Sequence, residues 1–293
     1  MITLRSIAAM GTSLLLALSA GSVFAVPFTP VLDEFRITKD GREIFHDSFT
    51  DGVVPPSGPD GQTTYFGVGF AGMTSESGGS LTMTPSLGDP TGLVGTFAER
   101  STVASRLLST NPVNSNFLGV DSYFSIHGLF DMSNLPMVTG QSFGIRATDR
   151  ALGIGNEGDD TYVLFVGMNL DSEIVVALRH VNMGTDVSTL LDSVSIQSLL
   201  PNAGKIELIL YKQAGASNLL TWYQVYDNSV APSVLSAGSI GSELTLGIYS
   251  GEDYIRGGFQ STDVVPVPEP ATLALFCLGV AGIYLVRRRR MIA

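Results

Sequence analysis

The feature that most constrains the fold is a long series of short segments in which apolar and polar residues alternate. From about residue 32 to residue 263, Gly, Ser, Asn and Asp interrupt these segments about every eight to twelve residues, which is typical of antiparallel β structure. The expected strands are 65–70, 80–84, 123–130, 142–148, 162–168, 173–180, 206–211, 219–226 and 244–249. Residues 194–200 carry the clearest helical signal, enough for one short turn.

The alternation also predicts which side of a strand faces the core. In the segment 206–211, Ile206, Leu208 and Leu210 should point inward. Residues 212–218 and 171–172 are expected to be hairpin loops between neighbouring strands. Hairpins at this spacing favour an antiparallel sandwich, and no internal repeat of fixed period suggests a propeller or a solenoid.

The N-terminal segment has the three parts of a secretory signal peptide. Arg5 supplies a positive charge, residues 14–18 form an apolar run, and small residues lead up to Ala25. We expect residues 1–25 to be a signal peptide that is cleaved after Ala25. An uncleaved N-terminal anchor is the alternative, although the apolar run is short of the roughly 20 residues that a spanning helix needs.

The C-terminal segment combines a rigid turn, an apolar run and a block of cations. Pro268, Glu269 and Pro270 precede the apolar residues 271–286, and Arg287, Arg288, Arg289 and Arg290 follow. Arginines are costly to move through hydrocarbon, so residues 271–286 are expected to form a transmembrane helix with the arginines on the cytoplasmic side. A helix buried in the globular domain is the alternative. Residues 261–267 are expected to be a linker.

This tail resembles the PEP-CTERM sorting signal of Gram-negative bacteria, which has a Pro-Glu-Pro motif, a short hydrophobic helix and an Arg cluster in this order. The resemblance implies an exosortase-type membrane protease as a partner, with Pro268, Glu269, Pro270 and the four arginines as the sorting residues. It also implies a precursor in the inner membrane and a final location at the cell surface. It covers residues 268–293, about a tenth of the chain.

Charge and cysteine content exclude several classes of function. The net charge is −11, and without Arg5 and the tail, where four arginines outweigh Glu269, the exported part is near −15. Such a charge disfavours nucleic acid as a partner. Cys277 is the only cysteine and lies in the tail. The exported part therefore has no disulfide, no cysteine-based zinc site and no thiol nucleophile.

The middle of the chain resembles the concanavalin-A-like jelly roll, the fold of laminin-G domains and of many lectins and glucanases. Two segments carry this resemblance, residues 44–52 and residues 246–251 with the strand 258–263 that follows. The resemblance implies a jelly-roll sandwich over residues 26–260 in which the first and last strands pair. An immunoglobulin-like sandwich, or a pair of small sandwiches, is the rival.

The motifs of common hydrolases are incomplete. The best match to the glucanase Glu-x-Asp-x-x-Glu strand is the segment 157–162, which lacks the final acid. The best match to a nucleophile elbow, residues 237–241, lacks the first glycine. His127 and His180 lie in expected strands, where we expect structural roles. We therefore expect no enzymatic activity.

Two groups of residues are candidates for ligand binding. Asn156, Glu157, Asp159 and Asp160 offer the oxygen ligands that calcium prefers, with a solvated acidic turn as the alternative. Trp222 and Tyr226 are expected on one side of a strand, with Tyr223 on the other, and an aromatic pair of this kind suits stacking against a sugar ring. For Trp222 alone we favour a place in the core.

The sequence thus predicts an exported, surface-directed bacterial β-sandwich without catalytic activity, an extracellular-matrix protein or a lectin-like protein that binds polysaccharide. An envelope glycan hydrolase or lyase is one alternative, and a purely structural matrix protein is another.

Overall fold

A computed structural model describes residues 28–50, 74–84, 92–94, 97–106, 116–119, 122–136, 138–150, 160–182, 187–216, 218–241, 244–245 and 254–266. The predicted signal peptide, the calcium candidates before Asp160, and the tail from residue 267 onward lie outside these residues. None of the described segments is a helix long and apolar enough to cross a membrane.

The first of two sheets has nine strands, and its main path runs β14-β13-β12-β7-β1-β4-β3, with β2 paired to β1 and β15 paired to β13. All of these pairs are antiparallel. The strands are β1 (Val31–Lys39), β2 (Arg42–Asp47), β3 (Thr74–Ser77), β4 (Ser80–Met83), β7 (Phe124–Asp131), β12 (Ala203–Lys212), β13 (Asn218–Asp227), β14 (Val234–Gly238) and β15 (Leu244–Thr245).

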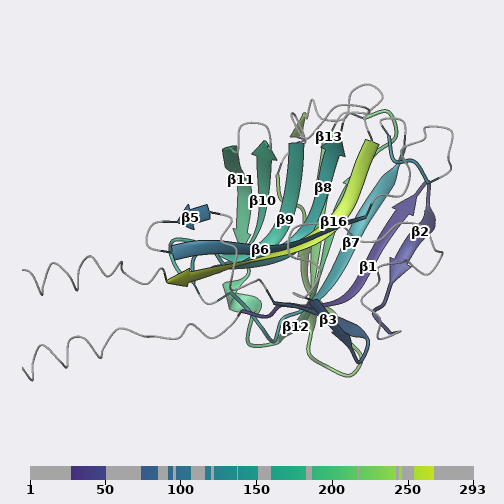
Figure 1. The fold of residues 1–293 in the computed structure, drawn as a ribbon. Helices are drawn as coiled ribbons and strands as arrows, with labels where there is room; N and C mark the ends of the chain where they lie inside the picture. Colours follow the sequence, from purple (N-terminus) through teal and green to yellow (C-terminus); the bar gives the residue numbers. More distant parts are fainter. Residues whose placement is uncertain are drawn as a thin grey trace, which may run out of the picture.

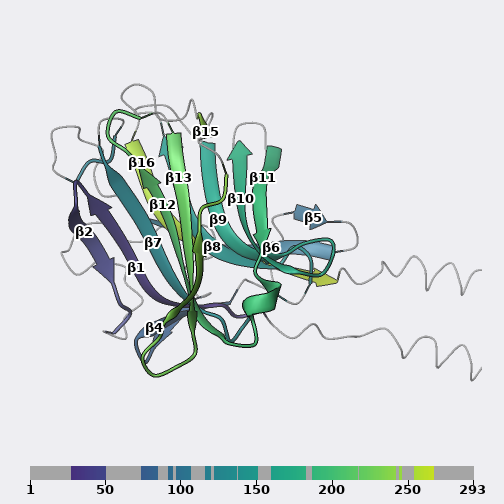
Figure 2. The same ribbon diagram turned by 180° about the vertical axis from the view of Figure 1, so that it is seen from behind.

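The second sheet has seven strands in the order β11-β10-β9-β8-β16-β6-β5, again all antiparallel. The strands are β5 (Gly92–Val94), β6 (Phe97–Arg106), β8 (Ser142–Arg150), β9 (Asp160–Met168), β10 (Ile174–Asn182), β11 (Val187–Ser195) and β16 (Tyr254–Pro266). Figure 1 shows β11, β10, β9 and β8 side by side, with the long strand β16 next to them. Figure 2 shows the same arrangement from behind.

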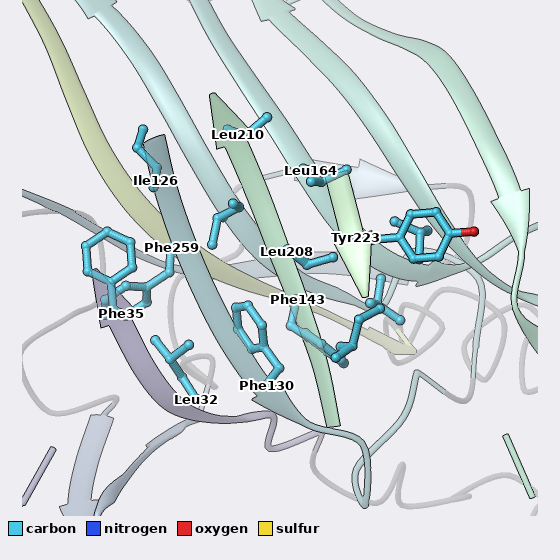
Figure 3. Close-up of a cluster of buried hydrophobic side chains, with 14 of the residues drawn as sticks. Leu32, Phe35, Ile126, Phe130, Phe143, Leu164, Leu208, Leu210, Tyr223 and Phe259 are labelled. Atoms are coloured by element: carbon cyan, nitrogen blue, oxygen red, sulfur yellow. The ribbon is translucent and has the colours of Figure 1, made fainter. Parts of the chain in front are cut away.

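The hydrophobic core lies between the two sheets. Phe35 of β1 meets Phe259 of β16 edge-on, with ring centroids 5.2 Å apart, and Phe130 of β7 lies 4.9 Å from Phe143 of β8. These rings come from opposite sheets, as the close-up of the core in Figure 3 shows. Buried aromatic side chains of this size contribute much of the stability that a chain without disulfides must draw from its core.

The predicted all-β class and antiparallel pairing are confirmed. Strands β4, β7, β8, β9, β10, β12 and β13 lie where the alternation predicts them. Ile206, Leu208 and Leu210 are all fully buried, as expected. The predicted hairpin loops join β12 to β13 and β9 to β10. The expected strand 65–70 lies outside the described residues, and of the expected strand 244–249 only Leu244–Thr245 is described.

Two expectations need correction. The first and last described strands do not pair, because β1 lies between β7 and β4 while β16 lies in the other sheet between β8 and β6. Residues 261–266, expected as linker, form the end of β16 and pair with β6 as far as Pro266. The short helical turn expected within 194–200 is confirmed as the 3₁₀ turn Gln197–Leu199, while the residues up to Ser195 complete β11.

Candidate functional site

Four neighbouring strands of the nine-stranded sheet build a polar outer face. In β1, β7, β12 and β13 the residues that alternate with the core positions point away from the other sheet. The register places His127 of β7 between Arg36 of β1 and Ile209 of β12, so that Glu207 of β12 is its diagonal neighbour. Residues far apart in the chain thus meet on one surface.

Glu207 is the centre of a hydrogen-bond network on this face. Its Oε1 accepts a hydrogen bond from Arg36 Nη2 at 2.8 Å and lies 3.0 Å from His127 Nδ1. Its Oε2 lies 3.1 Å from the Tyr226 hydroxyl, which shares its proton between Glu207 and Gln224 Oε1, 2.6 Å away. Three side chains from three different strands therefore hold one carboxylate in place.

The surroundings of Glu207 keep it ionised. Burial by itself would raise its pKa, but the hydrogen bonds with His127 and Arg36, the charge of His127 and the Tyr226 hydroxyl outweigh this effect. Together they lower the pKa of Glu207 from 4.5 to about 2. Burial and the neighbouring Glu207 charge raise the pKa of Tyr226 to about 12, so this phenol stays protonated.

The ionised carboxylate fixes the direction of its hydrogen bond with His127. Because it only accepts, the proton of the 3.0 Å contact belongs to His127 Nδ1. On the other side of the ring, His127 Nε2 is hydrogen-bonded to the Ser125 hydroxyl at 2.7 Å. Ser125 Oγ is in turn hydrogen-bonded to the Thr38 hydroxyl at 2.6 Å. The chain of hydrogen bonds runs from β1 through β7 to β12.

An open pocket of about 350 Å³ lies over this network. This volume falls within the range of roughly 300–1,000 Å³ that small-molecule sites occupy. The pocket is lined by the polar side chains of Glu34, Arg36, His127, Lys205, Glu207 and Tyr226, together with Leu129 and Pro232. It therefore combines many hydrogen-bonding groups with a substantial apolar surface.

Pro232 reaches the pocket from the loop between β13 and β14, and Asp227 shapes this loop. The Asp227 carboxylate accepts hydrogen bonds from the backbone N–H and hydroxyl groups of both Ser229 and Ser233. These hydrogen bonds, with the Ser229 hydroxyl first, lower the pKa of Asp227. The loop that forms one wall of the pocket is thus tied to the end of β13.

The predicted aromatic residues of β13 lie on two different faces of the strand, as expected. Tyr223 is buried in the core, while Trp222 and Tyr226 are half-buried on the outer face. Tyr226 lines the pocket. Trp222 pairs with Ile209, which in turn pairs with His127, so it lies one strand farther from β7. The expectation that Trp222 belongs to the core is wrong, because Leu219, Thr221, Tyr223 and Val225 fill the inward positions of β13.

The predicted calcium cluster is not open to test, since Asn156, Glu157 and Asp159 lie outside the described residues and Asp160 is the first residue of β9. Among the residues that the structure does describe, no group of three or more metal-binding side chains comes together. His180 stacks on Tyr162, with ring centroids 4.6 Å apart, which fits the structural role that we expected for it.

Sequence reasoning did not single out Arg36, Glu207 or Lys205. The only signal was the presence of charged residues at outward positions of strands, and most such residues are simply solvated. Arg36 and Glu207 are 171 positions apart in the chain, so their contact depends on the strand order of the sheet.

Comparison with known proteins identifies one segment of the chain. The family model of the PEP-CTERM protein-sorting motif matches residues 266–290. No curated protein and no solved structure matches the chain. The matched segment contains the Pro-Glu-Pro turn, the apolar run and the arginines, and it begins at the last residue of β16. The chain therefore carries a PEP-CTERM protein-sorting motif, the signal of an exported bacterial surface protein that an exosortase processes.

Proposed function

We propose that this exported β-sandwich binds extracellular polysaccharide through the pocket on its nine-stranded sheet, without cleaving it. The observation that carries the proposal is the pocket itself, where hydroxyl, carboxylate, guanidinium and ammonium groups converge beside Tyr226. Sugar hydroxyls need several such donors and acceptors, and the C–H face of a sugar ring packs on aromatic and apolar surface. Trp222 extends this surface along β13.

We also assign the sandwich to the jelly-roll type, as the resemblance of its sequence to concanavalin-A-like domains implies. Two facing antiparallel sheets around one core support this assignment. A fold alone does not fix a function. The pocket therefore carries more weight in the proposal than the fold.

An envelope glycan hydrolase is the second candidate, because Ser125, His127 and Glu207 are linked in the order of nucleophile, base and carboxylate. The surroundings of Ser125 favour binding over catalysis. Ser125 is only 6% exposed, and its Oγ is also hydrogen-bonded to the Thr38 hydroxyl. Its strand pairs on both sides, so its backbone N–H groups are engaged in the sheet and do not form an oxyanion hole.

The carboxylates of the pocket are also poorly suited to a two-carboxylate glycosidase mechanism. Such an enzyme needs a general acid whose pKa is raised, so that it holds a proton near neutral pH. The pKa of Glu207 is lowered to about 2 instead. Glu34, another carboxylate of the pocket, pairs with the same Arg36 guanidinium, with its Oε1 3.5 Å from Arg36 Nε.

A glycan array tests the proposal. We expect wild-type protein to bind at least one class of polysaccharide, and Tyr226→Ala to weaken that binding about tenfold or more through the loss of a central aromatic contact. Leu170→Ala, in the exposed turn between β9 and β10 of the other sheet, is the matched control and should bind like wild type. An array without signal would favour a purely structural matrix protein. Release of reducing ends from a bound glycan, lost in Ser125→Ala, would favour the hydrolase.

A further inference from the structure

The cations of the pocket already have carboxylate partners. Arg36 lies between two of them, with Nη2 2.8 Å from Glu207 Oε1 and Nε 3.5 Å from Glu34 Oε1. Lys205 Nζ lies 2.7 Å from Asp33 Oδ2 at the bulge of β1. To bind Arg36 or Lys205, an acidic ligand would have to compete with these carboxylates.

Three carboxylates, Asp33, Glu34 and Glu207, lie at or beside the pocket, and Arg36 and Lys205 are its fixed positive charges. The rings of His127 and His46 contact Glu207 and Glu34 and add positive charge only when they are protonated. With both rings neutral the local excess is negative, and the whole chain has a net charge of −11. A negative field of this kind repels anions as they approach and weakens their binding.

The groups that remain suit neutral hydroxyls. The Tyr226 hydroxyl stays protonated, directs its proton at Glu207 and Gln224, and leaves its oxygen as an acceptor. The Glu34 carboxylate, about one-third exposed, is a second acceptor. Leu129 and Pro232 supply apolar contacts. Sugar hydroxyls can donate to these acceptors without displacing an ion pair.

We propose that the pocket selects uncharged glycan chains and excludes acidic ones such as polyuronates. This inference rests on the proposed polysaccharide binding and adds the chemical class of the ligand. The exclusion of acidic chains comes from the carboxylates of Asp33, Glu34 and Glu207. They form ion pairs with the two cations of the pocket and leave its surface negative.

The single tryptophan offers a direct readout, because Trp222 is the only one in the chain and lies on the same face as Tyr226. Wild-type protein is titrated with hexasaccharides of glucose and of mannose, and with hexagalacturonate of the same length, and Trp222 fluorescence is followed. We expect saturable changes with at least one neutral hexasaccharide and none with hexagalacturonate. Binding of the neutral ligand should change less than about twofold between low and physiological salt, since no net charge is neutralised.

A double variant tests the cause of the selectivity. Asp33→Asn with Glu34→Gln keeps the side-chain shapes, removes two negative charges and leaves Arg36 and Lys205 less occupied. We expect it to bind hexagalacturonate in a saturable manner, with an affinity at least about tenfold above the limit that wild type sets, since two repelling charges are removed and two cations lose their carboxylate partners. Far-UV circular dichroism and thermal unfolding verify that the variant is folded.

The outcomes separate the two proposals. Tighter binding of hexagalacturonate than of the neutral hexasaccharides by wild-type protein would overturn the selectivity and leave polysaccharide binding in place. A folded double variant that gains no affinity for the acidic ligand would also overturn it. No fluorescence change with any of these ligands, together with a glycan array without signal, would overturn the polysaccharide binding on which the inference rests.

Discussion

Replacing Pro268, Glu269 and Pro270 by alanine should leave the chain as an unprocessed precursor. The three residues lie within the matched sorting motif, and a protease that reads this turn loses its recognition element when the rigid Pro-x-Pro geometry is removed. The measurement is an immunoblot of cell fractions from the native host against a tag placed after the signal peptide. Wild-type protein should be shortened and found at the surface, and the variant should remain full length in the membrane fraction.

The domain itself provides the control for this experiment. The substituted residues follow Pro266, the last residue of β16, so the sheet keeps all its strand pairs. The thermal unfolding midpoint of the variant's β-sandwich should therefore equal that of wild type. Normal shortening of the alanine variant would mean that the protease does not read this motif.

The second large effect concerns the stability of the sandwich in acid. The pKa of Glu207 is 4.5 in the reference state and about 2 in the folded protein, so the ionised carboxylate stabilises the fold above pH 4.5. This contribution is lost as the pH falls toward 2, where the folded state also takes up the proton. A shift of this size corresponds to roughly 3 kcal/mol of unfolding free energy.

Glu207→Gln isolates this contribution. The variant should be less stable than wild type by up to roughly 3 kcal/mol at pH 6, and the difference should shrink as the pH falls from 4.5 toward 2. Urea unfolding at a series of pH values measures it. Glu173→Gln, in the exposed turn between β9 and β10, removes a carboxylate outside the network and is the matched control. A difference between wild type and Glu207→Gln that does not change with pH would contradict the network described around Glu207.

Period-two alternation predicted much of the fold because most strands bury one face only. In β12 and β13 every second residue is buried, so the pattern in the sequence is clear. Strand β1 was not predicted because the bulge between Leu32 and Glu34 interrupts its alternation of apolar and polar residues. The hairpin between β1 and β2 had a recognisable signal, since its turn is Asp40-Gly41 and both residues have positive φ, as a two-residue turn of this type requires.

The order of strands was less accessible to sequence reasoning. The prediction that the first and last strands pair came from family resemblance, whereas the contact that forms is between sheets, with Phe35 packed on Phe259. The pocket was difficult to predict from the sequence for the same reason. Its residues come from β1, β7, β12 and β13, and only the register of these four strands brings Arg36, His127 and Glu207 together. Local sequence contains no information on such a register.

Nuclear magnetic resonance of the histidine and tryptophan side chains tests the binding pocket most directly. His127 lines the pocket, Trp222 shares its face, and His180 lies on the seven-stranded sheet against Tyr162. Upon addition of the neutral hexasaccharide, the His127 ring and Trp222 indole signals should move in a saturable manner, while the His180 signals stay in place. Saturable shifts of His180 alone, or of none of the three side chains, would contradict the assignment of ligand binding to this pocket.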